Sequence, residues 1–324
     1  MLRQTGRRAQ DDIAHYHGFA FAAVLGMLAH FLVLDGAAVN DRIMDDGIMS
    51  KKMQANAVVD MSRWDNEFTQ RNPILGQLSG LLPISGANWP TVPELNQRFN
   101  PSLSGEPLPV RFIDDADFIA LACYYEQAVA QGQVPTRDAN WHDFFGAVIW
   151  ALFPQTKALL TRLHMADIHA LGLTRTPRRD RITHFDECGL VMAVTQKAEV
   201  RALLEQHDWQ ELFIAQRARF GLCWQPFIFG HALYEQALAP FIGLTAKCVL
   251  VEVQPAFFTL SRAQQYAQLD AQLAAELEQT ALFEQPRPLL PLPLLGIPGW
   301  WPANQDPAFY DNQDYFRPRR PRKA

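Results

Sequence analysis

The stretch NWHDFFGAVIWALFPQTK, which begins at Asn140, constrains the fold more than any other part of the chain. Asn140 is a typical N-cap residue, and Asp143 stands at the third helical position, where a carboxylate meets free backbone N–H groups and the positive end of the helix dipole. The residues that follow leave little polar surface on any side of this helix, so we expect it to be central in the fold. Pro154 ends the helix, and a second helix is predicted to start there.

Further helices are predicted at several places along the chain. Thr91 and Glu94 have the spacing of a capping box and predict a short helix. Residues 113–132 carry their apolar side chains on one helical stripe and predict a single helix. Amphipathic patterns predict one or two helices over residues 197–218 and a polar helix that begins at Ser261.

Strands are predicted at only two places. Residues 181–194 alternate in character and contain a turn at 186–189, the pattern of a β-hairpin with glycine at a left-handed position. Residues 248–253 predict a buried strand. Helices mixed with a hairpin and an isolated strand, without regular strand–helix alternation, indicate the α+β class. We expect one mostly helical globular domain over residues 61–318, followed by a basic tail at 319–324.

Residues 296–316, GIPGWWPANQDPAFYDNQDYF, combine six aromatic side chains with three prolines. The prolines prevent a long helix or a central strand, so the segment must run irregularly. Its aromatic side chains have more apolar area than a soluble monomer usually leaves exposed in one patch. We therefore expect an aromatic C-terminal lid over the core, and the alternative is a partner-binding surface.

Composition narrows the partners and the compartment. A formal net charge of -5 with a pI near 6.0 gives no general attraction to nucleic acid, so we expect no nucleic-acid partner. The four cysteines stand far apart and form no C-x-x-C pair, and we interpret them as reduced thiols. This interpretation is compatible with a cytoplasmic protein.

Residues 1–60 are interpreted as an N-terminal extension, for which three explanations remain open. Residues 18–34 are apolar apart from one histidine and follow three arginines, the pattern of an export signal or of a short membrane anchor. The third explanation is a mis-assigned start, with translation beginning at a later methionine. We expect a cytoplasmic protein, with membrane anchoring or export through residues 1–38 as the alternative. No stable membrane association is expected unless residues 18–34 are retained.

Several blocks of the sequence resemble one family. They are NWHDFFGAVIWALFPQTK, PRRDRITHFDECG, FGHALYE, GLTAK and LLGIPGWWPANQDPAFYDNQDYFRP, and they follow one another between about Trp64 and Pro318. Through these blocks the chain resembles the bacterial family known as domain of unknown function 3025. That family is defined without an activity, so the resemblance implies membership and no reaction, substrate or cofactor.

His142, His231 and Glu235 are the candidate catalytic residues. His142 occupies the second position of the predicted central helix, where the dipole would keep its imidazole neutral and suited to act as a base or a ligand. His231 and Glu235 are four residues apart and share a helical face, so the carboxylate could orient the imidazole or both could bind one metal. Ordinary structural roles are the alternative for all three. No metal ligand is assigned, because the H-E-x-x-H pattern is absent and a third ligand has no known position.

Arg178, Arg179, Asp186, Trp300 and Trp301 are the candidate substrate-binding residues. Two neighbouring arginines can bind a carboxylate or a phosphate bidentately if they are held inward, whereas an exposed loop with ion pairs is the structural alternative. Asp186 is also expected to bond its own backbone in the predicted turn. The tryptophans are expected to ring the polar pocket.

Two functions follow from these candidates. The first is an acid/base enzyme that acts on a small anionic substrate, with Arg179 holding the anion. The second is a non-catalytic ligand-binding or protein-interaction domain. The sequence contains no phosphate-binding loop, nucleophile elbow or dinucleotide fingerprint, so no cofactor is assigned. Convergence of His142, Arg179 and His231 would favour the enzyme, and their dispersal would favour the binding protein.

Overall fold

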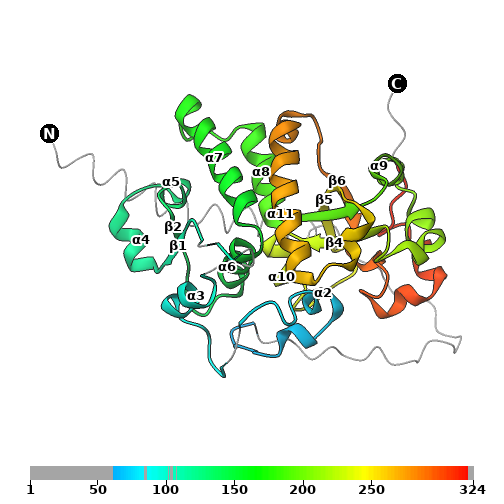
Figure 1. Cartoon of the computed structure of the whole chain (residues 1–324), viewed down its shortest axis with the longest axis horizontal. Coiled ribbons are helices and arrows are strands. Elements are labelled where there is room, and N and C mark those ends of the chain that lie inside the picture. The colour runs from blue at the N-terminus through cyan, green and yellow to red at the C-terminus, as the bar shows by residue number, and fades with distance from the viewer. Residues whose placement is uncertain (1–60, 84–85, 101, 103–104, 107, 320–324) are drawn as a thin grey trace, which may run out of the picture. The chain divides into compact units, whose positions relative to one another are not determined.

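The computed structural model describes residues 61–319, apart from 84–85, 101, 103–104 and 107 (Figure 1). The predicted N-terminal extension and most of the basic tail lie outside the described residues. The α-helices are α2 (Pro73–Gly76), α3 (Val92–Arg98), α4 (Asp115–Leu121), α5 (Tyr125–Ala130), α6 (Trp141–Leu152), α7 (Pro154–Leu171), α8 (Pro177–Cys188), α9 (Lys197–Gln206), α10 (His231–Gln236) and α11 (Arg262–Gln279). The strands are β1 (Arg111–Ile113), β2 (Gln133–Pro135), β3 (Gly189–Val194), β4 (Trp224–Ile228), β5 (Thr245–Glu252) and β6 (Leu290–Pro293).

The larger sheet has four strands in the order β4, β3, β5, β6. β3 is parallel to β5 and antiparallel to β4, and β5 is antiparallel to β6. The parallel pair requires a long crossover, which here runs through α9, β4 and α10. β1 and β2 form a separate parallel pair. Helices dominate and the sheets are small, which confirms the predicted α+β class.

The helix predicted to be central is confirmed. The side chain of Asn140 accepts a hydrogen bond from the backbone N–H of Asp143 and so caps α6, and nine of the twelve residues of α6 are buried. α7 starts at Pro154 and runs at 109° to α6. Its first N–H groups are satisfied by Asp270 of α11, which accepts hydrogen bonds from Gln155 and Thr156 at 2.9 Å. α7 packs against both α8 and α11, and the three helices lie in one region of the molecule in Figure 1.

No single described helix has both the length and the apolar character of a membrane span. α6 and α7 reach that length and character only as a pair, across the sharp bend at Pro154.

The prediction of one continuous helix over residues 113–132 is wrong, because the structure contains two helices, α4 and α5. Ala122 separates them in a left-handed conformation, with φ of 47°. The break allows Phe118 of α4 and Ala128 of α5 to pack with Ile113 in a small cluster apart from the main core. Tertiary packing therefore overrides the continuous helical stripe.

The predicted hairpin over residues 181–194 is also wrong. α8 starts after the N-cap Thr176 and continues directly into β3. Gly189, at the junction, has a φ of -73°, which is extended and not left-handed. Ile182 and Phe185, three residues apart, are fully buried on one helical face, so the period of this segment is helical. β3 finds its partners far away in sequence, in β4 and β5.

The aromatic segment 296–316 contains only short 3-10 helices, Pro302–Gln305 and Pro307–Asp311. The buried side chain of Asn304 donates hydrogen bonds to the carbonyls of Leu295 and Ile297 and so ties the segment to itself. Its buried aromatic residues are Trp300, Tyr310, Tyr315 and Phe316. These residues belong to the main core, whereas the role of the segment as a lid stays a prediction.

Candidate functional site

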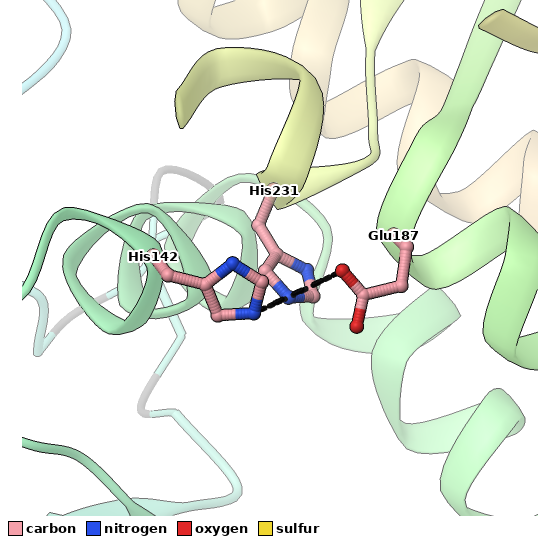
Figure 2. A group of neighbouring side chains, drawn as sticks. All are labelled: His142, Glu187 and His231. Atoms are coloured by element: carbon pink, nitrogen blue, oxygen red, sulfur yellow. Dashed lines mark hydrogen bonds and ion pairs between the residues drawn. The ribbon is translucent and has the colours of Figure 1, made fainter. Parts of the chain in front are cut away.

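Three helix ends bring His142, Glu187 and His231 together (Figure 2). His142 is the second residue of α6, His231 is the first residue of α10, and Glu187 lies in the last turn of α8. α10 packs against both α6 and α8, which places the three side chains in one group. His142 and Glu187 remain partly accessible, with side-chain exposures of 25% and 28%, whereas His231 is buried, with its side chain 11% exposed. Solvent therefore reaches the cluster from the side of His142 and Glu187.

One atom of each residue defines the geometry of the cluster. The Nε2 atoms of His142 and His231 are 2.9 Å apart, and Glu187 Oε2 lies 3.8 Å from the former and 3.4 Å from the latter. A triangle with these sides has a circumscribed circle of about 2.0 Å radius, so one central point is about 2.0 Å from all three atoms. This is the length of a zinc–nitrogen or zinc–oxygen bond. The three atoms are therefore spaced as the ligands of a single metal ion are.

Two buried polar atoms of the cluster have no hydrogen-bond partner among the described residues. Glu187 Oε2 is buried and has no hydrogen-bond donor, and His231 Nδ1 is also buried without a partner. Buried polar atoms normally find a partner, and a carboxylate oxygen can only accept. The donor set of two imidazoles and a carboxylate suits zinc, iron and other divalent transition metals.

Glu235 contacts His142 and so completes the cluster. His142 Nδ1 donates a hydrogen bond of 2.8 Å to Glu235 Oε2, which leaves a lone pair on Nε2 of the neutral ring. The sequence predicted that Glu235 pairs with His231, its neighbour on α10, either to orient that imidazole or to bind a metal with it. Its hydrogen bond goes instead to the histidine of another helix. Carboxylates hold metal-binding histidines in this way from the far side of the ring.

The two imidazoles have pKa values shifted in opposite directions. Burial lowers the pKa of His142, but the hydrogen bond to Glu235 and the charges of Glu187 and Glu235 outweigh burial and raise it above its usual value. The expectation that the helix dipole lowers the pKa of this imidazole is therefore wrong, because the neighbouring carboxylates act in the opposite direction. Burial also lowers the pKa of His231, the charge of Glu187 offsets only part of this, and His142 lowers it further. His231 is therefore neutral at pH 7 and has a lone pair to offer.

A close backbone contact explains why His231 reaches Glu187. Gly230 directly precedes His231, and its N–H donates a hydrogen bond of 2.8 Å to the carbonyl of Gly189. A Cβ on Gly230 would lie 2.3 Å from the carbonyl oxygen of Glu187 and 2.6 Å from the nitrogen of Cys188. Only glycine allows the start of α10 to approach the end of α8 this closely.

Asp186 lies beside Glu187 but does not form the predicted turn. Its carboxylate accepts a hydrogen bond of 2.6 Å from Lys157 Nζ, on α7. Burial raises the pKa of Asp186, but the charges of Lys157 and His231 together with the hydrogen bond from Lys157 outweigh burial and lower it overall. Its candidate role in substrate binding stays a prediction.

The two candidate substrate-binding arginines are engaged elsewhere. Arg179 is fully buried, and its guanidinium donates hydrogen bonds to Glu126 and to the carbonyls of Leu173 and Thr174. Arg178 forms ion pairs with Asp167 and Glu284. Both belong to the first turn of α8, not to a loop before a strand as the sequence suggested. Of the three residues whose convergence would favour an enzyme, His142 and His231 contact each other, whereas the hydrogen bonds of Arg179 go to other residues.

Trp300 and Trp301 lie in the C-terminal segment. Trp300 is buried in the core and Trp301 is partly buried against it. Among the described residues, no hydrogen bond joins residues 296–316 to α6 or α10. Their candidate role in substrate binding also stays a prediction.

Glu187 is the residue whose role the sequence did not reveal. It was interpreted as part of a turn because the hairpin was predicted in the wrong place. A signal does exist: Asp186 and Glu187 occupy the last turn of α8, and that turn contains no basic residue. Two carboxylates at the negative end of a helix dipole are unfavourable, and such a violation of a local rule is typical of a functional site.

The comparisons identify the family. Residues 110–320, more than half of the chain, match a family model described as "Protein of unknown function (DUF3025)". His142, Glu187, His231 and Glu235 all lie within the matched range. Comparison with curated proteins finds no match, and comparison with solved structures finds none either. The chain therefore belongs to the DUF3025 family.

Proposed function

We propose that this protein is a metal-dependent hydrolase with a mononuclear centre formed by His142, Glu187 and His231. One observation carries the proposal: the three donor atoms surround a common point at about 2.0 Å, the bond length of such a metal. Catalytic zinc sites typically use three protein ligands and keep the remaining position open for water or substrate. The partial exposure of His142 and Glu187 agrees with an open position.

The charge of the cluster also supports a cation. Glu187 and Glu235 are the carboxylates of the cluster, and neither has a Lys or Arg partner among the ion pairs of the described residues. The neighbouring acids differ, since Asp186 is paired with Lys157 and Asp143 with Arg137. A divalent ion would balance the two remaining charges.

The reaction we propose is hydrolysis by an activated water. A divalent metal lowers the pKa of a bound water, so that its oxygen can attack an acyl or phosphoryl centre at neutral pH. The new bond forms to the water oxygen, the bond to the leaving group breaks, and the proton released by the water passes to the leaving group. Glu235 would hold the His142 ring in the orientation that presents Nε2. Arg178 and Arg179 are already paired with carboxylates and are not free to hold a substrate. The charged group of a small anionic substrate would therefore bind at the metal.

A second candidate function is acid/base catalysis without a metal. The 2.9 Å contact between the two Nε2 atoms favours it, as do the opposite pKa shifts of the two rings. Titratable neighbours with pKa values pushed apart can divide the roles of acid and base. In this reading the His142 imidazolium is the acid and His231 is the base.

Metal loading distinguishes the two candidates. The purified full chain is stripped with a chelator and loaded separately with zinc, cobalt, iron(II) and manganese, and bound metal is measured by elemental analysis. We expect one ion per chain, and loss of binding in His142→Ala, Glu187→Ala and His231→Ala. His184→Ala is the matched control, since this exposed histidine lies on the same helix as Glu187 and should leave binding unchanged.

Activity is then measured against a panel of chromogenic esters, amides and phosphate esters, with and without the bound metal. The proposal expects hydrolysis that disappears with the metal and returns when the metal is restored. A folded wild-type protein that binds none of the four metals would rule out the metal centre. Hydrolysis by that metal-free protein, lost in either histidine variant, would instead support the histidine pair.

A further inference from the structure

Lys157 and Asp186 form an ion pair in which both charges oppose their own helices. Asp186 lies in the last turn of α8, where the helix dipole disfavours an anion. Lys157 is the fourth residue of α7, near the positive end of that helix, where a cation is disfavoured. Their side chains nevertheless meet at 2.6 Å. Each charge therefore compensates for the other across two helices.

The ammonium group of Lys157 also reaches a third helix. It lies 5.4 Å from the centre of the Trp150 ring, on α6, at a distance typical of cation–π contacts. The side chain of Lys157 is only 11% exposed, so its ammonium is held between α6 and α8. α6 carries His142 and α8 carries Glu187, two of the three side chains in the proposed centre.

Glu187 depends on such support because no hydrogen bond fixes its Oε2 atom among the described residues. The place of this oxygen is set by the backbone of the last turn of α8. Without Lys157, the negative charge of Asp186 would be uncompensated at the negative end of α8 and directly beside Glu187. Repulsion between the neighbouring carboxylates and fraying of the turn would both displace the oxygen.

We propose that Lys157 is a positioning residue for the metal centre. Through Asp186 it holds the last turn of α8, and through Trp150 it holds that turn against α6, so that Glu187 stays in reach of both histidines. This inference rests on the proposed function, since it assigns the ion pair to the support of the same centre. Supporting contacts around metal ligands typically contribute 10–100-fold to metal affinity.

The test compares zinc affinity in three variants of the full chain. Zinc binding is measured by competition with a chromogenic chelator, and the free energy of unfolding is measured by urea denaturation. Lys157→Met removes the charge and keeps the length, and we expect zinc affinity to fall about 10–100-fold. Lys157→Arg restores the cation and should recover most of the loss. Lys197→Met is the control, because Lys197 forms a partly buried 2.7 Å pair with Glu276, which is not part of the cluster.

The outcomes separate this inference from the proposed function. A folded Lys157→Met protein with wild-type zinc affinity overturns the positioning role and leaves the metal centre standing. Loss of affinity equal to that in Lys197→Met also overturns it, because the effect would then be one of general stability. A wild-type protein that binds no zinc removes the proposed centre itself. If Lys157→Met does not fold, Asp186→Asn removes the tether to Lys157 without leaving an uncompensated carboxylate beside Glu187: reduced affinity supports the positioning role, and unchanged affinity refutes it.

Discussion

Replacing Gly230 with alanine tests how the fold brings His231 to Glu187. The added Cβ would lie 2.3 Å from the carbonyl oxygen of Glu187, 2.5 Å from the nitrogen of Gly189 and 2.6 Å from that of Cys188. All three are backbone atoms, which cannot rotate away as a flexible side chain could. The φ of Gly230 is -70°, a value that any residue adopts, so the cost of the substitution is steric.

The size of the effect follows from the contact distances. An ordinary carbon–oxygen contact is about 3.3 Å or longer, so α10 must move about 1 Å away from the end of α8. That movement stretches the hydrogen bonds of 3.0 Å and 2.8 Å that Phe229 and Gly230 donate to the carbonyl of Gly189. We expect a loss of about 1–3 kcal/mol in the free energy of unfolding. We also expect at least a tenfold loss of zinc affinity, because ligand geometry must hold within about 0.5 Å.

Urea denaturation and zinc competition measure the two effects. Gly146→Ala is the control, since a Cβ at this position of α6 meets no atom within 4 Å, and alanine is the better helix former. This control should be as stable as the wild type or slightly more stable, with unchanged zinc affinity. If Gly230→Ala behaves like Gly146→Ala in both assays, the close approach of the two backbones does not position His231, and the reasoning fails.

Three further predictions concern other contacts. Glu235→Gln should weaken zinc binding about tenfold and lower the pKa of His142 in the metal-free protein, observable by NMR titration, because Glu235 now helps to raise that pKa. Glu126→Ala should cost about 3–5 kcal/mol in urea denaturation, since it leaves the fully buried Arg179 without its carboxylate, and a cost below 1 kcal/mol would contradict this. Burial lowers the pKa of His164 to about 4 from 6.5, so the unfolded chain binds a proton in that range while the folded chain does not. Stability should therefore fall by on the order of 3 kcal/mol between pH 6.5 and 4, and His164→Asn should remove that part of the pH dependence.

The local features of the fold were predictable from the sequence. The capped start of α6, its break at Pro154, the capping box at Thr91 and the start of α11 after Ser261 all match the structure. Each depends on interactions between residues three or four apart, which a sequence displays directly. The buried strand β5 was visible in its apolar run for a similar reason.

The errors arose where tertiary packing outweighs a local pattern. The residues Asp-Glu-Cys-Gly resemble a turn, yet in the structure they are the end of α8 and the start of β3, because β3 pairs with β4 and β5. The stripe over 113–132 resembles one helix, yet the chain breaks at Ala122 to bury Phe118 against Ala128. β4 and β5 lie far from β3 in the sequence, and Phe118 meets Ala128 only through a chain break that helical periodicity does not display.

The site divides in the same way. The sequence by itself determined that His231 and Glu235 share a helix and that His142 stands at the start of another, because helix caps and periodicity are local. Only the tertiary structure decided that Glu235 binds His142 and that Glu187 joins the two histidines. These contacts depend on how α6, α8 and α10 pack. The close approach of α10 to the end of α8 requires glycine at position 230, because a Cβ there would clash with the backbone of α8. A helical hydrogen bond joins residues four positions apart. The three donor atoms instead come from residues up to about 90 positions apart in the sequence, and only packing sets the distances between them.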